Sequence, residues 1–251
     1  MGCDKNNNLS LFSPQNDIDL GRQVKQEIES DPNQFPLLSR SQYSDAYDIL
    51  DGYFNEVLNS GEVAYRDEFP WEITIIGDDE VLNAFATPGG YIYVYTGLIK
   101  YLSTADELMG VLGHEVAHSD LRHTSRNLQK QYGVSVLLSL ILGEDPSQLQ
   151  QIAGQIAGTL AGLRFSREFE EEADDKSVVY LAKTPFRCDG AAGFFRLLRD
   201  NGDCNSNMEW LSTHPDPCNR VEDIEAMAAE QQCSTTPSNV DSYDDLIAAL
   251  P

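Results

Sequence analysis

Apolar positions in the first quarter of the chain recur at the spacing of an α-helix. In YDILDGYFNEVL, residues 47–58, they return every three to four positions, which places them on one helical face. Between Asp17 and about Ser60 this pattern predicts two helices, separated by Pro32 and Pro36, because proline interrupts helical hydrogen bonding.

The pattern then changes to that of β-strands. WEITIIG, residues 71–77, is β-branched and apolar, and YIYVYTGL, residues 91–98, alternates aromatic with other side chains. Both predict strands, and PGG at 88–90 predicts the turn between them, because glycine and proline favour tight turns.

Helical spacing returns in STADELMGVLGHEVAHSDLRHTSRNLQKQ, residues 103–131, where Thr104 and Glu107 form a capping box before an apolar stripe. Further helices are predicted at 134–163 (two pieces broken by GEDPSQ), 166–183, 190–200 and 219–232. We therefore expect an α+β fold, mostly helical, with a small sheet beside the helix that contains residues 114–118. Residues 1–16 are expected to be a flexible tether, 17–235 a single domain, and 236–251 a linker-like tail.

The charge balance excludes some functions. The chain has 251 residues and a net charge of -24, so nucleic-acid phosphates would be repelled and no nucleic-acid partner is expected. The charge is otherwise typical of a well-solvated surface, although a cationic substrate would also suit it. The longest strongly apolar run, Val134 to Leu142, is far shorter than the roughly 20 residues of a membrane helix. No transmembrane helix is expected.

The five cysteines divide unevenly along the chain. Cys3, followed by polar DKNNNLS, resembles the lipidated first residue of a mature bacterial lipoprotein, although a free thiol in an unstructured terminus is the plainer interpretation. The four late cysteines predict two disulfides and an oxidising compartment. Cys218 and Cys233 bracket a helix about 20 Å long, too far for a bond. Antiparallel helices would favour the nested pairs Cys188–Cys233 and Cys204–Cys218, the second enclosing His214.

Residues 112–118, LGHEVAH, carry the chemistry. His114 and His118 lie one helical turn apart, on one face and about 6 Å from each other, which suits two ligands of one zinc ion. Glu115 would then be the general base beside a water. A third ligand is expected from the acidic helix, but spacing alone does not choose among Glu168, Glu170, Glu171, Glu172 and Asp174, and acidic first turns also stabilise a helix dipole.

Four segments together resemble the HtpX-like and CAAX-prenyl-protease-type gluzincins, the forty-eighth family of metallopeptidases. They are NAFATPGGYIYVYTGLI (83–99), DELMGVLGHEVAHSDLRH (106–123), SREFEEEAD (166–174) and STHPDPCNR (212–220). The resemblance implies a zincin-like fold, Glu170 as third ligand and Asp174 as the acid that orients a histidine. It also places His214 and Arg220 near the metal, where His214 would stabilise the oxyanion or occupy the water position in a closed state, unless it is only structural.

The resemblance implies a zinc metalloendopeptidase with one zinc per chain. Because the chain lacks the hydrophobic helices of the membrane-embedded members, it resembles the small periplasmic lipoprotein members, anchored to the bacterial cell envelope through Cys3 alone. The expected substrates are unfolded or misfolded envelope proteins, bound in extended form along a free edge of the Tyr91–Tyr95 strand. The alternatives are a zinc-containing chaperone or assembly factor that does not cut, and a structural zinc protein with a closed four-ligand site. His123 is expected only to cap or pack locally on the same helix.

Overall fold

The computed structural model describes residues 2–3, 9–10, 12–142, 146–205, 210, 213–214 and 219–251, and confirms the α+β class. The strands are β1 (Gly2–Cys3), β2 (Leu9–Ser10), β3 (Glu72–Ile76), β4 (Ala84–Ala86) and β5 (Tyr91–Tyr95). The helices are α1 (Pro14–Ser30), α2 (Ser44–Leu58), α3 (Thr96–Tyr101), α4 (Ala105–Asp120), α5 (His123–Tyr132), α6 (Val134–Leu142), α7 (Pro146–Leu160), α8 (Arg167–Leu181), α9 (Gly190–Asn201), α11 (Val221–Gln231) and α12 (Ser242–Ala249), with a 3-10 turn, η1 (Asp203–Asn205).

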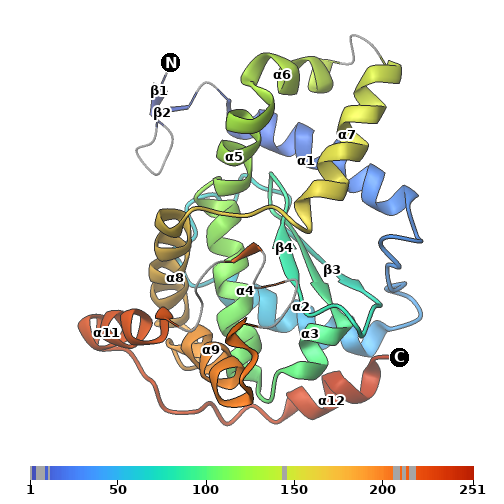
Figure 1. Cartoon of the computed structure of the whole chain (residues 1–251). Coiled ribbons are helices and arrows are strands. Elements are labelled where there is room, and N and C mark those ends of the chain that lie inside the picture. The colour runs from blue at the N-terminus through green and yellow to red at the C-terminus, as the bar shows by residue number, and fades with distance from the viewer. Residues whose placement is uncertain are drawn as a thin grey trace.

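Helix α4 runs through the middle of the molecule, with α8 on one side and the sheet on the other (Figure 1). Its N-cap Thr104 accepts a hydrogen bond from the Glu107 backbone N–H, as the capping box predicts. Nearly every residue of α4 is buried, because α2, α8, α9 and β4 pack around it. The helix that carries the two histidines is therefore the centre of the core rather than a surface element.

The close approach of α4 and α9 depends on a glycine. A Cβ atom built on Gly110 would lie 2.0 Å from the backbone nitrogen of Ala191, which no real contact allows. Any larger residue at position 110 would push the two helices apart.

The three-stranded sheet has the order β3-β5-β4, with β3 parallel and β4 antiparallel to β5. The expectation that the turn at 88–90 joins β3 to β5 is wrong, because this turn instead closes the β4–β5 hairpin, with positive φ at Gly89 and Gly90. The expected free edge on β5 is also wrong. Strand β5 is the central strand and is buried along its whole length. The three-residue strand β4, which the sequence did not predict, forms the edge of the sheet beside it.

The pleat of β5 divides the interior into two apolar clusters. Ile92 and Val94 face the cluster that contains α2, α4, α8 and α9. Tyr91, Tyr93 and Tyr95 face the opposite cluster, built with α1, α6 and α7. This alternation follows from the two-residue period of a strand.

Both ends of the described chain are more ordered than expected. Helix α1 begins at Pro14 behind the N-cap Ser13, and Phe12 is fully buried. The linker-like tail expected for 236–251 is wrong as a description of that segment, because it contains α12, whose Tyr243 and Leu246 are buried against the core beside α2. The Tyr243 hydroxyl also donates to the Ile99 carbonyl, which helps to dock this short helix. The domain limits themselves stay a prediction.

No helix in the described ranges is both long and apolar enough to cross a membrane.

Candidate metal centre

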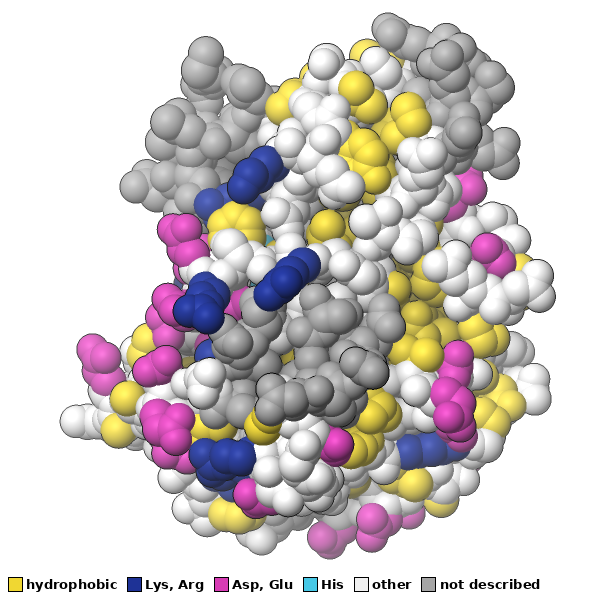
Figure 2. All heavy atoms as spheres, in the orientation of Figure 1, with side chains coloured by type: hydrophobic (Ala, Val, Ile, Leu, Met, Phe, Trp, Pro, Cys, Tyr) yellow, Lys and Arg dark blue, Asp and Glu magenta, His cyan; other side chains and the backbone are white. Residues whose placement is uncertain are grey.

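Four buried donor side chains meet above the middle of α4. The Nε2 atoms of His114 and His118 lie 3.0 Å apart, and each lies 3.6 Å from a carboxylate oxygen of Glu170 on α8. His214 joins them, and all four donor atoms lie within 4.8 Å of one another. The four side chains are at most 1% exposed. On the face shown in Figure 2, almost no histidine surface is visible.

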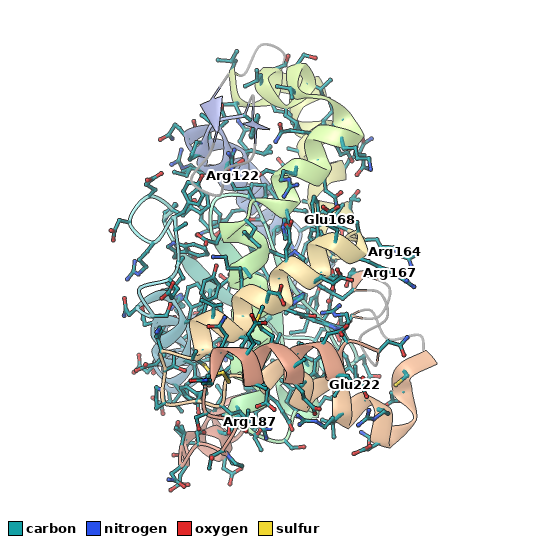
Figure 3. All side chains as sticks on the ribbon, turned by 90° about the vertical axis from the view of Figure 1, so that its left-hand side faces the viewer. Arg122, Arg164, Arg167, Glu168, Arg187 and Glu222 are labelled. Atoms are coloured by element: carbon teal, nitrogen blue, oxygen red, sulfur yellow. A yellow bond between two sulfur atoms is a disulfide. The ribbon has the colours of Figure 1, made fainter. Side chains whose placement is uncertain are left out.

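The start of α8 explains why Glu170 is the acid that enters the site. The Ser166 hydroxyl caps the helix by accepting from the Phe169 backbone N–H, so Glu170 falls on the inward face. Glu168 and Glu171 are exposed, and Figure 3 shows Glu168 at the N-terminal end of α8. The rotation of this helix therefore brings Glu170 and Asp174 to the histidines and leaves Glu168 and Glu171 exposed.

The donor atoms are arranged as a metal ion requires. Asp174 Oδ1 lies 2.9 Å from His114 Nδ1 and accepts its proton, so His114 would bind a metal through Nε2. Within the described residues, Glu170 Oε1, His214 Nε2 and both carboxylate oxygens of Glu115 are buried without a hydrogen-bond partner. Such buried polar atoms without a partner are costly unless an ion or water pairs with them. Two imidazoles and one carboxylate are a donor set that suits zinc.

Arg220 stabilises the acidic side of the site. Its guanidinium donates to both oxygens of Asp174 at 2.7 Å and also to Glu170 Oε2. Burial alone would raise the pKa of Glu170, but nearby His214 and Arg220, with hydrogen bonds from the other two histidines, hold it well below its usual range. For Asp174 burial is likewise outweighed, chiefly by Arg220, and its pKa is lowered. Both groups are therefore anionic at neutral pH.

His214 approaches from the C-terminal third of the chain and faces the base. Its Nε2 lies 3.4 Å from Glu115 Oε1, and its Nδ1 lies 2.8 Å from the Thr213 hydroxyl. The indole of Trp210 stacks on the imidazole with centroids 3.9 Å apart, and the His214 backbone N–H donates to the Trp210 carbonyl. Pro215, which the resemblance places beside His214, lies outside the described residues.

Trp210 was not identified from the sequence, although an aromatic residue four positions before a candidate site histidine is a usable signal. Phe165 was also missed. Its ring stacks on His118 with centroids 4.0 Å apart, and it precedes the cap of α8 by a single residue. Trp210 packs on His214 and Phe165 packs on His118, and each contact restrains the plane of the imidazole ring.

His123 lies elsewhere than expected. Helix α4 ends at Asp120, Arg122 adopts a left-handed conformation (φ 61°), and His123 begins the next helix, α5. Its Nδ1 lies 3.0 Å from His118 Nδ1, and its Nε2 lies 2.9 Å from Glu172 Oε2. The expectation of a local cap on the same helix is wrong, because a reversal without glycine gave no signal in the sequence.

The outer of the two predicted nested disulfides is present in the structure. Cys188 and Cys233 form a disulfide with Cα atoms 6.2 Å apart, joining the start of α9 to the end of α11. Cys204 is also disulfide-bonded, but its expected partner, Cys218, lies outside the described residues. The backbone of Cys3 lies in β1, paired with Leu9 of β2, and its lipidation stays a prediction.

Comparison with known proteins identifies the family to which the chain is similar. The family model described as Peptidase family M48 matches residues 50–228. The mitochondrial metalloendopeptidase OMA1 of Saccharomyces cerevisiae is 28% identical over 220 residues, 81% of this chain and 59% of the relative. The corresponding human protein is 29% identical over 189 residues, 68% of this chain and 36% of its own length. A putative beta-barrel assembly-enhancing protease of Vibrio cholerae is 30% identical over 169 residues, 61% of this chain and 34% of the relative. The chain thus spans between about a third and three fifths of these relatives.

Proposed function

Because the chain belongs to peptidase family M48, we propose that it is a zinc-dependent endopeptidase whose metal is held by His114, His118 and Glu170. One observation carries the proposal: the Glu115 carboxylate is fully buried beside three convergent donors, and neither of its oxygens has a hydrogen-bond partner among the described residues. Zinc bound there would supply Lewis acidity toward the scissile carbonyl and a nearby water.

The protein's own residues would transfer the protons and stabilise the developing charge. Glu115 is free to accept the proton of the attacking water and to deliver it to the leaving amine. His214, whose Nε2 faces Glu115, would donate to the developing oxyanion, and in a closed state it would instead take the fourth ligand position. Asp174 and Arg220 hold the first histidine and the glutamate in place.

The proposed substrates are polypeptides bound in extended form. Since β5 is central, strand addition would have to use the outer side of β4. There the Ala84 N–H donates to Asn83 Oδ1 and the Ala86 carbonyl accepts from the Thr124 hydroxyl, so a bound strand would replace these two contacts. The name of the Vibrio cholerae relative supports proteins of the cell envelope as substrates. The Cys188–Cys233 disulfide supports an oxidising location such as the periplasm, and an anchor at Cys3 would hold the protein at the membrane.

The test combines zinc analysis with casein cleavage, with and without a chelator. We expect one zinc per chain, cleavage that the chelator abolishes, and a Glu115→Gln variant that keeps its zinc but cleaves at least about a hundredfold more slowly. Near-full activity of this variant at one zinc per chain would overturn the mechanism. Casein binding without cleavage is the result expected of a non-proteolytic chaperone.

A second prediction concerns the third ligand. Glu170→Ala should lose most of the zinc, whereas Glu171→Ala, on the exposed side of the same helical turn, should keep it. Equal zinc in both variants, measured by metal analysis after dialysis, would contradict the assignment of Glu170.

The close approach of His214 also favours a second candidate, a structural site with four protein ligands. His214→Ala separates the two. A catalytic site should keep its zinc without His214, whereas a structural site should lose most of its affinity together with its fourth ligand.

A further inference from the structure

We propose that His123 and Glu172 form a hydrogen-bonded relay that positions His118 and selects the tautomer in which its Nε2 can bind a metal. This inference rests on the proposed metal site and deepens it, because it assigns a role to two residues outside the ligand set. Neither residue would touch the metal or the substrate, so both would be positioning residues.

The relay is a linear chain of two contacts that ends at the protein surface. His118 Nδ1 lies 3.0 Å from His123 Nδ1, and His123 Nε2 lies 2.9 Å from Glu172 Oε2. Both imidazoles are fully buried, whereas the Glu172 side chain is 42% exposed. The carboxylate can therefore stay ionised in contact with water while it fixes a buried ring.

With both imidazoles neutral, only one arrangement of protons satisfies the two relay contacts, His118–His123 and His123–Glu172. The Glu172 carboxylate accepts, so His123 must carry its proton on Nε2, and its Nδ1 is then an acceptor. His118 must donate to that acceptor from Nδ1, which leaves the lone pair on its Nε2 facing His114 and Glu170. The reverse arrangement would turn the His123 Nε2 lone pair toward the carboxylate and would put a proton where the metal binds. The anionic glutamate thus selects the metal-binding tautomer through two rings.

Stacking restrains both rings in the plane that the relay needs. Phe165 stacks on His118 with centroids 4.0 Å apart. Phe169 is parallel to His123 within 1°, with centroids 4.2 Å apart, and Arg126 covers the other face of Phe169 at 4.3 Å. Stacking therefore fixes the plane of each ring, and the contacts at the ring nitrogens fix which edge of the ring faces which partner.

The two histidine ligands are therefore held differently. His114 is oriented directly by the carboxylate of Asp174, which Arg220 in turn holds. His118 is oriented by a neutral histidine, and the charge that fixes it lies one ring farther away. Outer partners of this kind typically contribute about 10-fold to 100-fold to metal affinity.

The experiment measures zinc affinity by competition with a chromogenic chelator, and the visible spectrum of the cobalt-substituted protein. His123→Phe keeps the stack on Phe169 but removes the acceptor, and should weaken zinc binding about 10-fold to 100-fold and alter the cobalt spectrum. His123→Asn returns an acceptor oxygen near the Nδ1 position and should recover most of the affinity. Glu172→Ala should weaken binding by about 10-fold, whereas Glu171→Ala, its exposed neighbour, should match the wild type.

The outcomes are separable. Two results would overturn the role of His123. In the first, the His123→Phe variant binds zinc as tightly as the wild type. In the second, the His123→Asn variant binds zinc as weakly as the His123→Phe variant, while both remain folded in chelator. Equal affinities of Glu172→Ala and Glu171→Ala overturn the relay beyond His123, and Glu172→Ala still tests it if the buried variants do not fold. A wild-type chain that binds zinc but cleaves no casein overturns only the proposed function, and one that binds no zinc overturns both.

Discussion

Replacing Arg220 with methionine should strongly destabilise the metal-free protein. The arginine is 6% exposed, and its guanidinium contacts both oxygens of Asp174 and one oxygen of Glu170. It also lies 4.7 Å from the ring centroid of Phe195. Methionine keeps the apolar stem against that ring but leaves two buried carboxylates without their shared cation.

The magnitude follows from that geometry. Removing one partner of a buried ion pair costs about 3–5 kcal/mol, because the remaining charge is left uncompensated in a poorly solvated place. For a chain of this size 1 kcal/mol shifts the melting temperature by about 2–4 °C, so we expect a loss of about 6–20 °C. The combination Arg220→Met with Asp174→Asn should cost less than the sum of the two single changes, because it leaves one fewer buried charge.

The assay is thermal unfolding of the wild type, both single variants and the double variant, in chelator and with disulfides intact. Chelator matters because a bound metal would itself compensate Glu170 and mask part of the effect. A loss below about 1 kcal/mol for Arg220→Met, or strictly additive changes, would refute the argument that Arg220 offsets buried negative charge.

Two further predictions concern the scaffold, and both are measured by thermal or denaturant unfolding. Gly110→Ala should lower the free energy of unfolding by about 3 kcal/mol or more, because its methyl group would meet the backbone of α9. The control Gly52→Ala, whose added Cβ has nothing within 4 Å, should stabilise α2 by up to about 1 kcal/mol. Similar effects of both substitutions would contradict the close contact between α4 and α9. Replacing Cys188 and Cys233 together by serine should lower the free energy of unfolding by up to about 4 kcal/mol, because the bridge closes a loop with a sequence separation of 45. An unchanged melting temperature would show that this bridge does not limit stability.

Much of the fold was predictable because it depends on contacts between near neighbours. The helical periods around Leu50 and in 103–118, the Thr104 cap and the start of α7 at Pro146 all depend on residues within one or two helical turns of each other. The relative placement of His114 and His118 belongs to the same class, because any α-helix puts residues four apart on one face. Zinc chemistry was therefore a legitimate expectation before any tertiary structure was known.

Tertiary structure decided whatever depends on contacts between distant segments. Which acid completes the site follows from the rotation of α8 against α4, since Glu170 and Glu171 differ only in the face they occupy. The position of β5 between β3 and β4 depends on pairing across some twenty residues, and a three-residue strand carries too short a pattern to predict. His123 contacts His118 only because Arg122 takes a left-handed conformation, which residues 121–122 did not signal. Local periodicity specifies the faces of a helix, but only packing determines what each face meets.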